Sequence, residues 1–470
     1  MTTAAPPRRT RLLRLVLVAL AVALWFVAPP DGLTRDAWRL FVIFATTIVS
    51  VVVNALPILT ASVFAVAASV LSGLLSPAKA YAGFANGTIL LIVLAFLVAR
   101  AVVKSGLGAR AGYYVVSLFG RSTLGLSYSI FLVDALIAPA FPSNTARSGV
   151  IYPLAFSLAE AGGAKADQDE CRRVGSFLMF SGIVSLSLSS ALWLTAMAAN
   201  PLGAEIARNF GVEISFGGWM LASCVPTLVA MIVMPPVLYW LIAPERTSTP
   251  NAPAEARKQL AALGPLTRDE KIVLAAFAGM VALWGMAATF HIDSTAVAFL
   301  GLGLLLASGV LTLSDIAKEG DVLATFIWFA VLFTLSGQLN ELGFMGYLGQ
   351  RIAASLGGVP VLAVGLILVV AYVLLHYVFV SQTAHALALF GVFLDVGVRL
   401  GVPAAPLAFQ LLFATNYFSC ITPQGSSANL LFAGSGFLSQ SDLYRLGGIT
   451  TALSMMIYLV VGTPWLRLVL

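Results

Sequence analysis

Charged side chains are scarce in this chain of 470 residues. Only 10% of the residues are Asp, Glu, Lys or Arg, 60% are hydrophobic, and the mean hydropathy is +0.97. Soluble domains contain about 25% charged residues, so this composition excludes a soluble globular protein. The longest polar stretch, at about 244–271, is also too short for a soluble domain. The chain is therefore expected to be an integral membrane protein in contact with the lipid bilayer.

Cysteine and histidine are rare as well. The chain has three of each: Cys171, Cys224, Cys420, His291, His376 and His385. The cysteines are far apart and show no disulfide or metal-ligand spacing, so we interpret them as small apolar packing residues. The histidines form no Ser/His/Asp triad and no metal-ligand group within one apolar segment. These absences argue against a membrane enzyme.

The net charge of +6 is spread over the loops rather than gathered on one polar face, which argues against a nucleic-acid partner. Four arginines precede the first apolar segment, 15–27: Arg8, Arg9, Arg11 and Arg14. Pro29-Pro30 follows that segment in place of a small-residue cleavage site, so we predict an uncleaved first helix rather than a signal peptide. The surplus of Lys and Arg in alternate loops predicts a cytoplasmic N-terminus and a multi-pass protein of the cell inner (plasma) membrane.

Apolar segments recur along the chain in two corresponding halves. At about 20 residues per span they predict an all-α integral membrane fold with about 11 transmembrane helices. Each half is expected to contain scaffold helices and then a transport unit made of a re-entrant hairpin, a broken helix and a final span. The boundaries are 1–122 and 123–243 for the first half, 244–270 for a cytoplasmic linker, and 271–358 and 359–470 for the second half. An odd number of crossings per half makes these two repeats inverted in the membrane.

Two polar runs with the same order of residue types interrupt the apolar halves. The first is Ser143-Asn144-Thr145-Ala146-Arg147, and the second, 238 positions later, is Ser381-Gln382-Thr383-Ala384-His385. Pro139 and Pro142 end a helix just before the first run, which places the run at the tip of a hairpin. Hydroxyl, amide and backbone N–H groups at such a tip can donate hydrogen bonds to an anion. Helix capping is the simpler explanation for one hydroxyl alone, but the second copy favours an anion site.

The fifth residue of each run is a candidate cation. Arginine at membrane depth is costly unless it is paired or hydrated, so we expect Arg147 to offset the charge of substrate carboxylates. A structural pair with Asp134, nine residues before the first run, is the alternative. For His385, a protonated side chain and a neutral, hydrogen-bonded one both remain open.

Polar breaks also interrupt the helix that follows each hairpin. The first break carries Thr195, Asn200 and Pro201, and the second carries Thr422, Pro423, Gly425, Ser426, Ser427 and Asn429. Discontinuous helices at corresponding positions of two halves are the best sequence indication of a transporter's binding site. Packed proline kinks would explain either break alone. Because there are two, we expect both breaks to contribute to one substrate site with the hairpin tips.

The paired tips, with Ala-Asn-Pro at 199–201 and Pro-Gln-Gly-Ser-Ser-Ala-Asn at 423–429, resemble the divalent anion:sodium symporter family over nearly the whole chain. The resemblance implies a homodimer with a scaffold and an elevator-type transport domain. It also implies that the tips face the carboxylates of a C4–C6 di- or tricarboxylate, such as succinate, malate, 2-oxoglutarate or citrate, through Ser143, Asn144, Thr145, Ser381 and Thr383. Gln382 departs from the Asn common at the second tip, and its extra methylene group would narrow the pocket.

Two coupling modes remain open within this family. Arg147 and His385 stand as in exchangers that resemble the citrate/succinate and 2-oxoglutarate/malate translocators. A site with fixed cations of its own needs no sodium, and its empty, net-positive form crosses the membrane poorly, which favours exchange. The second broken helix is closer to the Thr-Pro-x-Gly pattern of sodium symporters. We predict anion exchange without a cofactor, with sodium-coupled dicarboxylate or sulfate symport, and hence a bound sodium ion, as the alternative.

Overall fold

The computed structural model describes residues 8–165 and 172–470, so the prediction for Cys171 lies outside the described residues. Within these ranges the secondary structure is helical, apart from one antiparallel bridge between Ser122 and Ser248. Eight of the described helical segments are long and apolar enough to cross a membrane: Gly87–Ser105, Thr123–Ala140, Arg172–Leu192, Phe216–Ile242, Arg268–Phe290, Gly320–Glu341, Val361–Val378 and Gln440–Val469. The prediction of an all-α membrane protein is confirmed.

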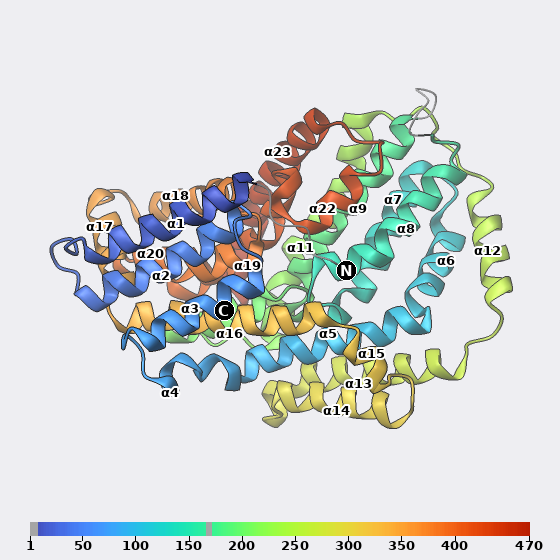
Figure 1. The fold of residues 1–470 in the computed structure, drawn as a ribbon. Coiled ribbons are helices and arrows are strands. Elements are labelled where there is room, and N and C mark those ends of the chain that lie inside the picture. The colour runs from blue at the N-terminus through green and yellow to red at the C-terminus, as the bar shows by residue number, and fades with distance from the viewer. Residues whose placement is uncertain (1–7, 166–171) are drawn as a thin grey trace.

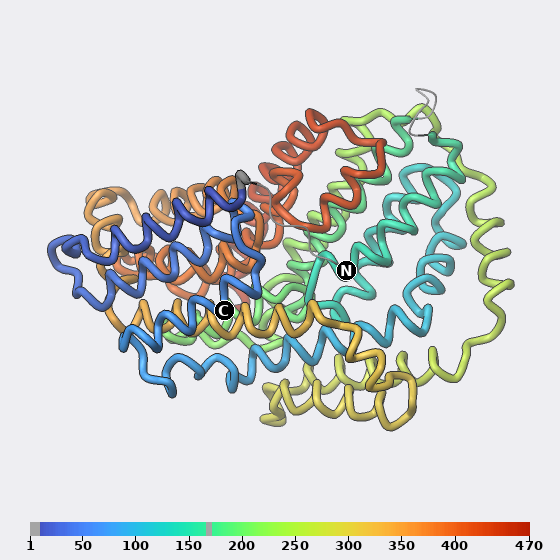
Figure 2. Tube along the Cα trace, in the orientation of Figure 1, coloured from blue at the N-terminus to red at the C-terminus, as the bar shows by residue number. Residues whose placement is uncertain are grey.

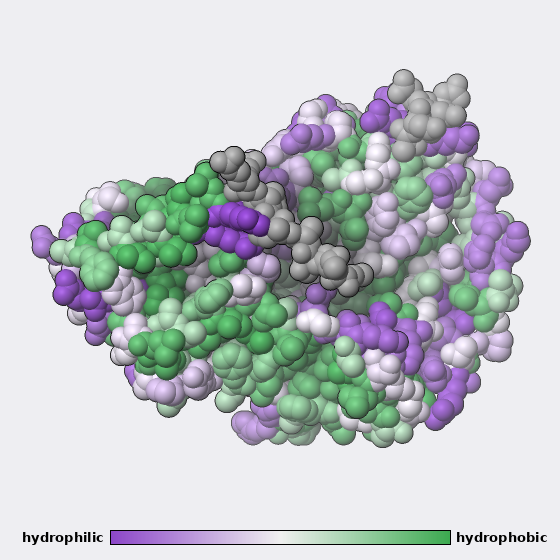
Figure 3. Space-filling model, viewed as in Figure 1, coloured by the Kyte–Doolittle hydropathy of each residue, from purple (hydrophilic) through white to green (hydrophobic). Residues whose placement is uncertain are grey.

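The surface also has the character of a membrane protein. Large apolar side chains are exposed on α1 (Arg8–Phe26), α3 (Ile58–Leu71), α13 (Arg268–Phe290) and α14 (Ser294–Ala307). Figure 3 shows apolar side chains over much of one face and hydrophilic side chains along its right edge, where α12 (Ala252–Leu263) lies. Such extended apolar surface is unfavourable in water and fits contact with lipid.

Scaffold helices of the two halves interleave. α16 (Gly320–Glu341) packs against α2 (Arg35–Val52) and α3, and α5 (Gly87–Ser105) packs against both α14 and α16. Figure 2 accordingly shows blue segments of the first half beside yellow and orange segments of the second. Lys104 of α5 donates a hydrogen bond of 2.6 Å to Asp315 of the other half, and this bond holds the pKa of that carboxyl group well below its usual value. The two scaffold regions therefore form one packed body.

Corresponding glycines turn the chain after α5 and α16. Gly106 and Gly343 have φ of +80° and +82°, in the left-handed region that favours a residue without Cβ. Each glycine is followed by a short helix, α6 (Leu107–Phe119) or α17 (Phe344–Ser355). α12, which lies in the linker between the halves, packs on α6. The same local device thus ends the scaffold segment in both halves.

The first transport unit is a helical hairpin followed by a broken helix. Its arms are α7 (Thr123–Ile137) and α8 (Asn144–Ala161), joined through a 3-10 turn at Ala138–Ala140. α9 (Arg172–Leu192) packs against both arms, and every residue from 177 to 192 is buried. The chain breaks before α10 (Ala199–Ala207) and ends the unit with the long α11, Phe216–Ile242. α9 is therefore the centre of this unit.

The second transport unit repeats this order with one difference. Its helices are α18 (Val361–Leu375), α19 (Gln382–His385), α20 (Gly391–Arg399), α21 (Ala404–Tyr417), α22 (Ser427–Ala433), α23 (Gln440–Ile457) and α24 (Thr463–Val469). The outgoing arm of its hairpin is interrupted, because a π-helical turn at Ala386–Phe390 separates α19 from α20. π-Helical turns occur frequently at functional sites. Figure 1 shows this hairpin at the left and the α7–α8 hairpin at the right, with their tips directed toward the middle.

Candidate functional site

The two hairpin tips lie against each other. The Asn144 side chain donates a hydrogen bond of 3.1 Å from Nδ2 to Oε1 of Gln382, the residue 238 positions later. Gln382 donates in turn from Nε2 to the carbonyl oxygen of Thr415 in α21, at 2.8 Å. Both amide side chains are buried. The two polar runs therefore form one cluster in the folded chain.

Ser143 and Ser381 begin the outgoing helices of the hairpins. The Ser143 hydroxyl accepts a hydrogen bond from the backbone N–H of Ala146 at 3.4 Å, and Ser381 accepts one from Ala384 at 3.2 Å. Helix capping, the simpler explanation, is thus correct for both residues. Capping uses the hydroxyl as an acceptor, so each hydroxyl proton can still be donated to a ligand.

Asn200 and Asn429 close the two broken helices in the same way. Each side-chain amide donates to the carbonyls of the residues ten and seven positions before it, at 2.9 and 3.2 Å for Asn200 and at 2.7 and 3.1 Å for Asn429. A helix that stops inside the protein leaves such carbonyls without partners, and buried carbonyls need one. Asn416 joins the two breaks by donating to Oδ1 of Asn200 at 2.8 Å. Both predicted residues therefore serve the backbone of the breaks.

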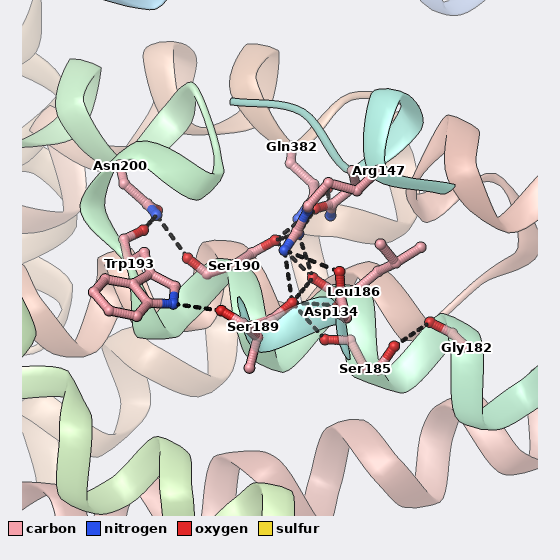
Figure 4. Close-up of polar contacts among 12 residues, drawn as sticks. Asp134, Arg147, Gly182, Ser185, Leu186, Ser189, Ser190, Trp193, Asn200 and Gln382 are labelled. Atoms are coloured by element: carbon pink, nitrogen blue, oxygen red, sulfur yellow. Dashed lines mark hydrogen bonds and ion pairs between the residues drawn. The ribbon is translucent and has the colours of Figure 1, made fainter. Parts of the chain in front are cut away.

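Arg147 lies in a cluster of oxygen atoms behind the first tip (Figure 4). Its guanidinium group donates to four oxygens: Ser189 Oγ (2.6 Å), the Leu186 carbonyl (2.8 Å), Asn144 Oδ1 (2.5 Å) and Ser190 Oγ. Asp134 lies 3.4 Å from the guanidinium group and also accepts a hydrogen bond from Ser189. The side chains of Arg147 and Asp134 are both 0% exposed.

These contacts show how the charge of Arg147 is held in the folded chain. The alternative, a structural pair with Asp134, is the arrangement found, and it offsets the positive charge inside the protein. Arg147 donates to Oδ1 of Asn144, and Nδ2 of the same amide donates to Gln382. In this conformation Arg147 therefore acts on the tip junction through Asn144. Arg147 is therefore a positioning residue for the tip junction rather than a cation that faces an open cavity.

His385 takes the equivalent position behind the second tip, in aromatic surroundings. Its ring centroid lies 4.4 Å from that of Tyr372, 4.7 Å from Phe418, 4.9 Å from Phe379 and 5.3 Å from His376. Neither ring nitrogen of His385 has a hydrogen-bond partner among the described residues. The hydrogen-bond partners that would hold a neutral His385 in place are therefore absent among the described residues.

A cavity of about 310 Å³ opens beside the junction. The second hairpin contributes Ser381 and Ala384 to its lining, the second broken helix contributes Gln424 and Ser427, and the scaffold contributes residues of α2, α3 and α16. Thr145 of the first tip contacts the same place, because its hydroxyl lies 2.5 Å from that of Ser427 and both residues are exposed. The second tip, one broken helix and the scaffold thus line the cavity, and Thr145 of the first tip contacts its lining at Ser427.

Predicted site residues divide into two groups in the structure. Ser381 and Ser427 line the cavity and Thr145 contacts Ser427, while Ser143 and Pro423 are half-buried outside the lining. The others are buried outside its lining: Asn144, Arg147, Gln382, Thr383, His385, Thr195, Asn200, Pro201, Thr422, Gly425, Ser426 and Asn429. Thr195, for example, donates to the carbonyl of Pro139 at 2.9 Å and fixes the start of the first tip.

Sequence reasoning missed four polar or aromatic residues of the cavity: Gln424, Asn54, Trp328, and Phe379, which lies two residues before the second tip. Gln424 lies inside the second break, so its position in the Thr-Pro-x-Gly segment was a usable signal. Asn54, after α2, and Trp328, on α16, come from the scaffold, and no repeated pattern marks them. Only the packing of the second hairpin against the scaffold brings them to the site.

Comparison with known proteins identifies the family. The family model described as the sodium:sulfate symporter transmembrane region matches residues 9–470. The chain is 39% identical over 453 residues to a putative malate transporter of Bacillus subtilis, covering 96% of this chain and 95% of that protein. It is 37% identical over 460 residues to the chloroplastic dicarboxylate transporter 1 of Arabidopsis thaliana, covering 97% and 82%.

A solved structure supports the fold. The YdaH transporter of Alcanivorax borkumensis aligns with a TM-score of 0.53 at 16% identity, over 98% of this chain and 99% of that one. The family match and the relatives named as transporters confirm the resemblance seen in the tips and breaks, and the prediction of a transporter rather than an enzyme. The chain belongs to the sodium:sulfate symporter family, a family of membrane transporters.

Proposed function

We propose that this chain transports C4–C6 dicarboxylates, of which malate is the first candidate, through the site at the hairpin tips. The observation that carries the proposal is the Asn144–Gln382 contact, which joins both tips beside one cavity. Hydroxyl and amide donors border this cavity, and no acidic side chain lines it. A volume of about 310 Å³ accommodates a small organic anion. The relatives named for malate and dicarboxylate transport support the same substrate class.

Anion exchange is the coupling mode that the site favours. Sodium, which the family description implies, would need several free oxygen ligands at the tips or breaks. The oxygens behind the first tip already bind the Arg147 guanidinium group, and a second cation beside it would be repelled. At the second break, the carbonyl of Gly425 is bound by His376 and two more carbonyls are bound by Asn429. Because these oxygens are already bound by protein donors, we infer exchange without sodium rather than sodium-coupled symport.

The architecture that we propose is based on the contacts that recur in the two halves of the chain. Residues 123–243 and 359–470 form a transport domain, residues 1–122 and 271–358 form the scaffold, and residues 244–270 link them. Two re-entrant hairpins and two broken helices then leave about 11 crossings in two inverted repeats. We place the N-terminus in the cytoplasm of a cell with the protein in its inner membrane. We also propose a homodimer whose transport domains move against the scaffolds as elevators.

Preloaded vesicles test the proposed function. Proteoliposomes that contain malate should take up labelled malate without sodium, and empty vesicles should not. Ser381→Ala and Ser427→Ala should each weaken binding by about 1.5–3 kcal/mol, because a hydrogen bond to a charged group is lost. Ser157→Ala is the matched control, since Ser157 is exposed and donates to its own helix at Leu154.

Other outcomes would change the proposal. Uptake that requires an inward sodium gradient would replace exchange by sodium-coupled symport. Uptake of sulfate but of no dicarboxylate would overturn the substrate class and leave the site in place. No transport of either anion in vesicles that hold folded protein would contradict the proposed function as a whole.

A further inference from the structure

Two histidines form a buried pair behind the second tip. His376 and His385 are both 0% exposed, and their ring centroids lie 5.3 Å apart. His376 Nε2 donates to the carbonyl of Gly425 in the second break at 2.9 Å, so its Nδ1 is left as an acceptor. That Nδ1 and both nitrogens of His385 have no partner among the described residues. The pair can therefore bind a proton. Neither anion exchange nor sodium-coupled symport, as described above, involves His376.

The corresponding place in the first half holds a permanent ion pair instead. Asp134 and Arg147 stand 238 positions before Tyr372 and His385, and each couple is in contact in the folded chain. Where the first half has a carboxylate, the second half has a phenol, which is uncharged near neutral pH. The Tyr372 hydroxyl is also committed elsewhere, at 2.9 Å from that of Thr415. A charge on His385 would therefore have no built-in counter-charge.

No acidic side chain among the described residues forms an ion pair with either histidine. The elements packed on this segment present Ser336 of α16, Ile206 of α10 and Thr415 of α21, which are uncharged. Asp395 of α20 is bound to Arg399 at 2.6 Å. Because an isolated buried cation is very unfavourable, the pair is neutral while the site is empty.

A dianion in the cavity changes this balance. Ser381 and Ala384 line the cavity, and His385 follows Ala384 directly. Phe379, also in the lining, contacts the His385 ring at 4.9 Å, so one layer of side chains separates the pair from the cavity. The Arg147 charge is already offset by Asp134. The second tip is therefore the place where the protein can still gain a positive charge close to the bound anion.

We propose that His376 and His385 form a proton-binding site that takes up one proton from solution when a dicarboxylate dianion occupies the cavity. The inference rests on the proposed function and adds a second substrate to it, a proton that enters the site with each dianion. Two protons on the pair are disfavoured, because two imidazolium groups at this distance repel each other. Proton and dianion affinities are then coupled, and each ligand strengthens the binding of the other by the same factor.

Proton uptake on binding measures this coupling directly. Purified protein in weakly buffered detergent solution, with a pH-sensitive dye, is mixed with malate between about pH 6.5 and 8.5, where both malate carboxyl groups are ionised. We expect uptake that approaches one proton per bound dianion, and an apparent KM for exchange that rises by up to about tenfold per pH unit. His376→Gln with His385→Gln should bind malate without proton uptake and with a KM independent of pH. If this double variant does not bind malate, each single variant should show reduced uptake.

His291→Asn is the matched control, because His291 is the remaining histidine, lies exposed after α13, and adopts the left-handed backbone that asparagine tolerates. It should keep the full uptake and pH profile of the unaltered protein. Malate binding and exchange without proton uptake at any pH would overturn this inference alone. Failure of malate to bind or exchange at all would instead contradict the proposed function.

Discussion

Arg147 illustrates how a single charged side chain is tolerated at membrane depth. Its guanidinium group is held by Asp134 and by hydroxyl, amide and carbonyl oxygens, with none of its side chain exposed. Each hydrogen bond removes part of the desolvation cost, and the carboxylate removes the net charge. The arginine can then fix the orientation of Asn144 at the tip junction, and its charge needs no hydration inside the membrane.

Removal of one member of this pair should be far more damaging than removal of both. We expect Arg147→Ala to lower the free energy of unfolding by about 3–5 kcal/mol, because Asp134 would remain as an uncompensated buried charge. Asp134→Asn in the same chain should restore part of that loss. Thermal unfolding in detergent measures both variants. Arg445→Ala is the matched control, because its pair with Asp442 is 62% and 37% exposed and should be worth about 1 kcal/mol or less.

At the scale of elements, the same pattern of asparagine hydrogen bonds stabilises both broken helices. Asn200 and Asn429 each return to the helix end before the break and satisfy the carbonyls ten and seven residues earlier. The identical spacing in both halves is evidence in the folded chain for the repeat that the sequence suggests. A non-helical segment can therefore remain inside the protein without unpaired backbone groups.

Substitution of these asparagines should destabilise the two broken helices and lower the unfolding temperature. Asn200→Ala removes the side-chain donor to the Ser190 carbonyl, whereas the Trp193 carbonyl keeps the Ala196 N–H, and the loss should cost about 1–3 kcal/mol for the group left unsatisfied. Asn429→Ala should behave alike. Asn209→Ala, at an exposed position just beyond α10, should leave the thermal unfolding temperature nearly unchanged. Equal unfolding temperatures for the Asn200 and Asn209 variants would show that these hydrogen bonds contribute nothing.

At the scale of the whole molecule, few polar contacts tie the transport units to the scaffold. One is the hydrogen bond of 3.1 Å from Thr88 of α5 to Glu205 of α10. The scaffold itself is joined across the halves by Lys104 and Asp315. This difference suits a body that stays in place and a second body that moves against it, as in the elevator that we propose.

Cross-links between cysteines distinguish these two kinds of contact. In a background without the native cysteines, Thr88→Cys with Glu205→Cys, joined by a short reducible thiol cross-linker, should lose malate exchange until the cross-link is reduced. Lys104→Cys with Asp315→Cys, joined by the same reagent within the scaffold, should keep exchange unchanged. Full cross-linking of the first pair with normal exchange would show that α10 does not move relative to α5.

The sequence by itself determined the membrane class, the helical architecture and the two polar runs, because composition and local residue order control lipid partition, helix ends and turns. It also placed Asp134 within reach of Arg147 as an alternative. Only the tertiary structure decided that this alternative holds, that Asn144 meets Gln382, and that Asn54 and Trp328 complete the cavity. Such contacts join residues far apart in the chain, and no local pattern specifies which buried partner a side chain finds when several helices pack together.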